Sequence, residues 1–258
     1  MANLVGFTLL GLAVGVPGIA SADDVGYQLE TSVASSYVVR GIPQYATRGV
    51  PSSQSSASVH VDHVGDGTVM FGVWNAVAME DYDTQPGTAL EVDVSVAYAV
   101  RAGALSLTTG YGANLFPSHM HDTPVDGAHE LSAVVSYDTP YVVPAAAAYV
   151  EFVHQQGVYL QLGASRDLPH AAWTFSPALS VGGATYRKYA GGDRAATPHL
   201  NDVTAAVTVR RELDAGVYAS AKLSYSLCGT PSDLMPMESW GFDGRSTMYG
   251  VVAVGVAR

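Results

Sequence analysis

The chain has 258 residues, of which 48% are hydrophobic and only 14% are charged, well below the charged fraction of about a quarter that is usual for soluble domains. The 23 Asp and Glu against 12 Lys and Arg give a net charge of −11, which excludes a nucleic-acid partner because no basic surface is left to neutralise phosphates. The one cysteine, Cys228, excludes an internal disulfide.

The first predicted element is an export signal. Residues 4–18 form an apolar run broken by Gly and Pro, and Ala20-Ser21-Ala22 follows with the small-residue pattern of a signal-peptidase site. The run is shorter than the roughly 20 apolar residues of a spanning helix. We therefore predict a signal peptide over residues 1–22 and one mature domain over residues 23–258. The start lacks the usual Lys or Arg, and an N-terminal membrane anchor is the alternative.

The mature chain alternates between apolar and polar residues with a period of two, which is typical of β-strands. Over residues 90–101 the even positions are apolar, and the odd positions are charged or small. About twelve segments of this kind have the length of a membrane-spanning strand, near residues 25–40, 52–62, 68–80, 88–101, 103–114, 128–138, 146–155, 157–165, 172–186, 201–211, 214–227 and 246–257. Since no segment suits a spanning helix, we predict an all-β fold, a single antiparallel transmembrane β-barrel of about 12 strands in the bacterial outer membrane.

The predicted connections alternate in length, as they do in outer-membrane barrels. Short periplasmic links are expected at 63–67, 102, 139–145, 165–171 and 212–213, and longer outer loops at 41–51, 81–87, 115–127, 187–200 and 228–245. The link at 155–157 is short where a long loop is expected. A secreted β-sandwich is the alternative fold, but the polar faces carry Ser, Thr, Gly and Gln more than the Lys and Glu of a surface in water.

Residues 35–44 read Ser-Ser-Tyr-Val-Val-Arg-Gly-Ile-Pro-Gln. They resemble the first-strand pattern S-D-Y-V-F-R-G-I-S-Q of the TorF-type porin family of conserved outer-membrane β-barrel proteins. Residues 71–75 resemble the family's G-x-W-x-S-N stretch, and residues 90–98 its L-E-x-D-x-x-x-G-Y strand. The likeness spans roughly residues 27–115, and it implies location and architecture more than activity. Ser36, Pro43 and the last residue, Arg258, depart from the usual pattern, since such barrels commonly end in an aromatic residue.

The candidate functional residues are charges on the polar strand faces, where lumen-lining charges tune ion selectivity: Glu30, Arg40, Glu91, Asp93, Arg101, Arg210 and Lys222. Arg40 is expected on the first strand beside Glu30. Its structural alternative is an interior ion pair with Glu91 or Asp93 that ties strands together. Those two carboxylates are more often counter-ions to Arg40, Arg210 or Lys222 than ligands of a cation.

The other candidate residues give weaker signals. His119, His121, Asp122 and His129 have a spacing that suits zinc or copper, but a solvated polar loop is favoured. Trp74, Trp173 and Trp240 are predicted to be aromatics at the membrane interface. No G-x-S-x-G or related nucleophile pattern occurs, so we predict no enzyme, no cofactor and no metal site.

These observations predict a porin-like channel for the passive diffusion of small solutes or ions. A mild preference for cations is expected because the predicted lumen and outer loops are rich in acids. The alternative is a closed barrel with a structural or surface-binding role through loops 187–200 and 228–245, and a lipid-modifying barrel enzyme is a third reading. Membrane lipid is the expected partner.

Overall fold

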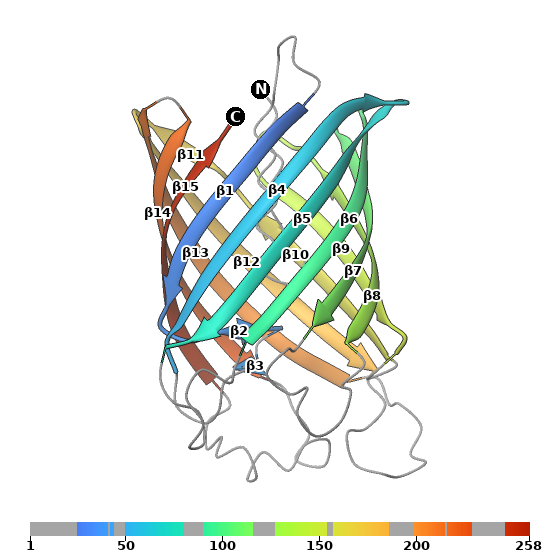
Figure 1. Ribbon diagram of the computed structural model, residues 1–258, viewed down its shortest axis with the longest axis vertical. Coiled ribbons are helices and arrows are strands. Elements are labelled where there is room, and N and C mark those ends of the chain that lie inside the picture. The colour runs from blue at the N-terminus through green and yellow to red at the C-terminus, as the bar shows by residue number, and fades with distance from the viewer. Residues whose placement is uncertain are drawn as a thin grey trace.

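The computed structural model describes residues 25–40, 42–43, 50–79, 90–115, 127–153, 157–185, 199–214, 216–228 and 246–258. These residues form a closed antiparallel β-barrel with tilted strands (Figure 1). None of them belongs to a helix that is long and apolar enough to cross a membrane. The predicted signal peptide at 1–22, the loop with His119 and His121, and Trp240 lie outside the described residues.

Twelve long strands of the described chain form the barrel wall. They are β1 (Val25–Ala34), β4 (Ser52–Val64), β5 (Gly67–Ala78), β6 (Leu90–Ala102), β7 (Leu105–Leu115), β8 (Ala128–Tyr137), β9 (Val143–Glu151), β10 (Gly157–Ser165), β12 (Trp173–Thr185), β13 (His199–Asp214), β14 (Val217–Cys228) and β15 (Ser246–Ala257). Each pairs with the next wall strand along the chain, and β1 pairs with β15 to close the ring. The short strand β11 (Leu168–His170) pairs with the start of β12. The predicted fold class is confirmed.

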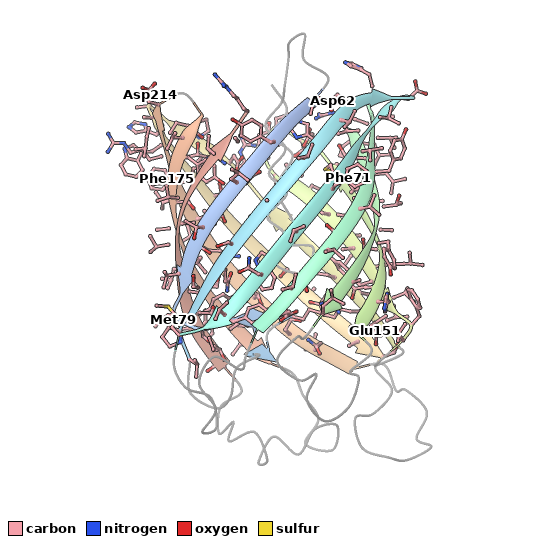
Figure 2. The ribbon with its side chains drawn as sticks, viewed as in Figure 1. Asp62, Phe71, Met79, Glu151, Phe175 and Asp214 are labelled. Atoms are coloured by element: carbon pink, nitrogen blue, oxygen red, sulfur yellow. The ribbon has the colours of Figure 1, made fainter. Side chains whose placement is uncertain are left out.

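The period-two pattern of the sequence separates the outer face of the wall from the lumen. In β6, Val94 is 39% exposed on the outside, whereas Glu91 and Asp93 are buried on the inside. Large apolar side chains are exposed all around the wall, among them Phe71 and Phe175, which Figure 2 labels on two sides of the barrel. An apolar outer face around a closed sheet with no free edge is the structure that strands adopt in lipid. The outer face of the barrel wall thus suits the lipid of the bacterial outer membrane.

The two ends of the barrel differ in the length of their connections, as the sequence predicts. At one end the wall strands join through short links, and β1 begins and β15 ends there (Figure 1). Three of these turns place glycine at positive φ: Gly65, Gly103 and Gly216. The links at the other end are long, apart from the one after β9. In bacterial barrels short turns face the periplasm, so the end marked by Met79 and Glu151 in Figure 2 is the outer mouth.

One segment near the mouth leaves the wall. The first strand was expected to continue to residue 40, but β1 ends at Ala34. Ser35 still binds β15, because its backbone NH donates to the Gly250 carbonyl at 2.8 Å and its hydroxyl accepts from the Gly250 NH at 2.9 Å. The chain then forms β2 (Val38–Val39) and β3 (Ile42–Pro43), which pair only with each other. We call residues 37–40 and 42–43 the inward hairpin.

Candidate functional site

The base of the inward hairpin packs on the inner face of β5. The rings of Tyr37 and Trp74 lie 5.2 Å apart between centroids and are tilted by 42°, and both are buried together with Ala76. The prediction that Trp74 belongs to the membrane interface is therefore wrong, since the side chain is only 2% exposed and lies inside the barrel. Trp173, by contrast, is 41% exposed.

The tip of the inward hairpin reaches the opposite wall through Arg40, which has a positive φ of 49°. The Arg40 Nη2 lies 2.5 Å from Oε2 of Glu130 on β8. The guanidinium carbon lies 4.7 Å from the ring centroids of both Tyr149 on β9 and Tyr159 on β10. Asn201 of β13 donates its side-chain amide to the Arg40 carbonyl at 2.7 Å. Strands β8 and β9 lie across the ring from β1, so the hairpin spans the lumen.

This placement corrects two expectations about Arg40. It does not lie on the first strand beside Glu30, and its ion-pair partner is Glu130 rather than Glu91 or Asp93. The reason is that the chain turns inward after Ala34 and carries the guanidinium past β6 to β8. Period-two alternation gives the side of a strand but not the point at which the strand leaves the wall.

Acidic side chains gather at the same end of the lumen. Glu91 and Asp93 are buried on β6, and the Asn114 amide lies 3.4 Å from Glu91. No Lys or Arg of the described residues forms an ion pair with either carboxylate. Glu130 and Glu151 stand directly opposite each other in the pairing of β8 with β9, and both are buried. Among the described residues, no three His, Cys, Asp or Glu side chains form a group that could hold a metal ion.

A buried carboxylate on β13 holds one of the two tyrosines that flank Arg40. Asp202 accepts from the Tyr159 hydroxyl at 2.8 Å, from the Asn201 amide at 3.0 Å and from the Thr204 hydroxyl at 3.2 Å. Gly182 on β12 leaves room for this contact, because a Cβ there would lie 2.2 Å from the Tyr159 hydroxyl oxygen and 2.5 Å from an Asp202 oxygen. The network fixes the Tyr159 ring against the guanidinium. We call Arg40, Glu91, Asp93, Glu130, Glu151 and Asp202 the mouth cluster.

The remaining candidate residues lie away from the mouth cluster. Glu30 accepts from the Tyr218 hydroxyl at 2.8 Å, and Arg210 stacks on the Tyr218 ring at 3.7 Å while donating to Glu212 at 2.7 Å. Arg101 is exposed at the periplasmic rim, where it pairs with Asp138.

Lys222 stands on β14 between Thr208 and Val251 of the neighbouring strands, and its side is the one shared by the buried Ser224 and Ser226. The structure thus divides the seven predicted residues between the mouth and the periplasmic half, and only Arg40, Glu91 and Asp93 belong to the mouth cluster.

Sequence reasoning did not single out Tyr149, Tyr159, Glu151 or Asp202. All four continue the alternation of their strands on the inner side, and this is the signal by which they could have been found.

A closed wall that is apolar outside and polar inside, with one segment folded into its lumen, defines an outer-membrane β-barrel. Solved structures of this class share the fold. A NanC porin gives a TM-score of 0.52 at 9% identity, over 90% of this chain and 98% of that chain. An outer membrane channel from Pseudomonas putida F1 gives a TM-score of 0.54 at 8% identity, over 94% of this chain and 99% of that chain. The sequence matches no protein-family model and no curated protein.

Proposed function

We propose that the barrel is a channel for small solutes and ions, with a mouth narrowed by the inward hairpin. The observation that supports this most is the lumen lining, which carries charges of both signs at the outer mouth and again in the periplasmic half. A barrel that served only as a scaffold would be free to fill its interior with apolar side chains. The fold shared with a porin and a channel supports the same proposal.

The mouth cluster supports a mild preference for cations. It contains five acidic side chains, those of Glu91, Asp93, Glu130, Glu151 and Asp202, and one guanidinium, that of Arg40. A negative constriction concentrates cations and repels anions. Salt screens this field over a Debye length of about 10 Å at 0.1 M, so the preference should weaken as the salt concentration rises.

Reversal potentials measured across a salt gradient in a planar bilayer test this selectivity. We expect cation preference at low salt that fades toward 1 M salt. Glu91→Gln combined with Asp93→Asn should reduce it, whereas Asp138→Asn, at the periplasmic rim, should leave it nearly unchanged. Anion preference at neutral pH would contradict the assigned role of the mouth cluster.

A closed barrel with a binding role is the second candidate, and one observation favours it. The inward hairpin is held to the wall on both sides of the lumen, because Tyr37 packs on Trp74 of β5 and Arg40 pairs with Glu130 of β8. A hairpin that never leaves this position and fills the mouth would prevent conduction. We propose no catalytic role for the chain.

A further inference from the structure

The side chains that surround the Arg40 guanidinium form a cation-binding cage, which we define as Tyr149, Tyr159 and Glu130. The two rings lie 5.9 Å apart between centroids and are tilted by 45°, and each presents its face to the guanidinium carbon at 4.7 Å. The Glu130 carboxylate completes the cage at 2.5 Å from Nη2. Aromatic faces combined with a carboxylate are the chemistry that proteins use to bind guanidinium and ammonium groups.

The cage belongs to the barrel wall and not to the hairpin that fills it. Tyr149 and Tyr159 are opposite each other in the pairing of β9 with β10, and they are 2% and 1% exposed. Tyr159 is fixed by its hydrogen bond to Asp202. The Tyr159 wall of the cage should therefore keep its shape when the hairpin withdraws, and Tyr149 is held beside it by the pairing of β9 with β10.

The charge of the cage also favours binding of a cation. Glu130 faces Glu151 across β8 and β9, and Arg40 is the cation that forms an ion pair with Glu130. Removing the guanidinium would leave two buried carboxylates side by side. Since isolated buried charge is costly, a cation that fits between the rings would bind there in competition with protonation of the carboxylates.

We propose that this cage is a binding site for the guanidinium or ammonium group of a small organic cation, and that Arg40 is its built-in occupant. The planar guanidinium suits two ring faces and a carboxylate best. A solute carrying that group competes with Arg40 for the cage and thereby releases the tip of the inward hairpin. This release controls passage only if the barrel conducts, so the role in transport rests on the proposed function, whereas the binding itself does not.

Calorimetric titration of the refolded Arg40→Ala variant in detergent micelles tests the site. The probe is methylguanidinium chloride, and urea serves as a neutral planar control at equal ionic strength. We expect saturable binding of methylguanidinium, no binding of urea, and binding to the wild type weaker by about tenfold or more, because the tethered Arg40 acts as a competitor at high effective concentration.

Further variants assign the binding to the cage. Adding Glu130→Gln or Tyr149→Leu to Arg40→Ala should abolish the binding. Arg101→Ala removes a guanidinium at the periplasmic rim, and it should bind methylguanidinium no better than the wild type. An intact barrel is verified for each variant by its heat-modifiable migration in gels, and Arg40→Gln replaces Arg40→Ala if the latter does not fold.

The outcomes separate the site from the transport function. Folded Arg40→Ala that fails to bind methylguanidinium, or that binds urea equally well, overturns the proposal, even if the barrel conducts. Saturable and charge-dependent binding supports the site, even if no conductance is found. Where the variant conducts, methylguanidinium should also reduce its current, and urea should not.

Discussion

Arg40 and Glu130 form an ion pair with 2.5 Å between Nη2 and Oε2, although one follows β1 and the other lies on β8, across the ring of strands. The pair forms because the chain turns inward after Ala34 and crosses the lumen as a hairpin. The hairpin has a second anchor at Tyr37, which packs on Trp74. Residues 37–40 are thus anchored at both ends, by Trp74 on β5 and by Glu130 on β8.

The assignment of the two faces of β6 predicts that Val94→Arg destabilises the protein far more than Ser95→Arg. Val94 faces outward and pairs with Val73 near the middle of the wall, where an arginine in lipid costs about 2–4 kcal/mol. Ser95 faces the lumen between Gly72 and Gly112, which leave room for the longer side chain. Urea unfolding in liposomes measures both free energies of unfolding. Equal losses would show that the faces are assigned wrongly or that no bilayer surrounds the barrel.

The contact between Tyr159 and Asp202 predicts that Gly182→Ala is destabilising. A Cβ at Gly182 would lie 2.2 Å from the Tyr159 hydroxyl oxygen, and overpacking of this kind typically costs about 1–3 kcal/mol. Gly112→Ala is the matched control, because the nearest atom to its Cβ would be 3.9 Å away. Thermal unfolding followed by gel mobility should show a lower midpoint for the first variant only, and an unchanged midpoint for Gly182→Ala would contradict the packing.

The buried and exposed ion pairs should differ in strength. Glu130→Gln removes the buried carboxylate that pairs with the half-buried guanidinium of Arg40, and we expect a loss of about 2 kcal/mol or more in the free energy of unfolding. Asp138→Asn breaks the pair with Arg101 at the exposed rim, where such pairs contribute less than about 1 kcal/mol. The two variants are compared in one unfolding assay with the wild type. A loss at Glu130 no greater than at Asp138 would mean that water solvates Arg40 in the lumen.

Much of the wall could be predicted from the sequence, because lipid on one side and a polar lumen on the other impose a strict period of two. In β6 the even positions face out and the odd positions face in, as the residues indicate. The same rule would have placed Trp74 correctly. Trp74 shares its side of β5 with Gly72 and Ala76, whereas Phe71 and Val73 face outward, but its residue type suggested the membrane interface.

The inward hairpin could not be predicted from periodicity. Tyr37 and Val39 continue the apolar positions of β1, so the period-two pattern does not change at Ala34, where the wall strand ends. Tyr37 is buried, and Val39 is partly buried, against Trp74 and Ala76 inside the barrel instead of facing lipid. The mouth cluster could not be predicted from the sequence either, because its members come from strands distant in the sequence and meet only when the ring closes.

Conductance in planar bilayers, measured in parallel for the refolded wild type and for Arg40→Ala, tests the central claim most directly. If the barrel is a channel with a mouth narrowed by the inward hairpin, the wild type conducts. The variant should then conduct more and prefer cations more strongly, because it lacks the one guanidinium of the mouth cluster, whereas Arg101→Ala at the rim should match the wild type. Folded wild type and folded Arg40→Ala that both fail to conduct would contradict the account and favour a closed barrel.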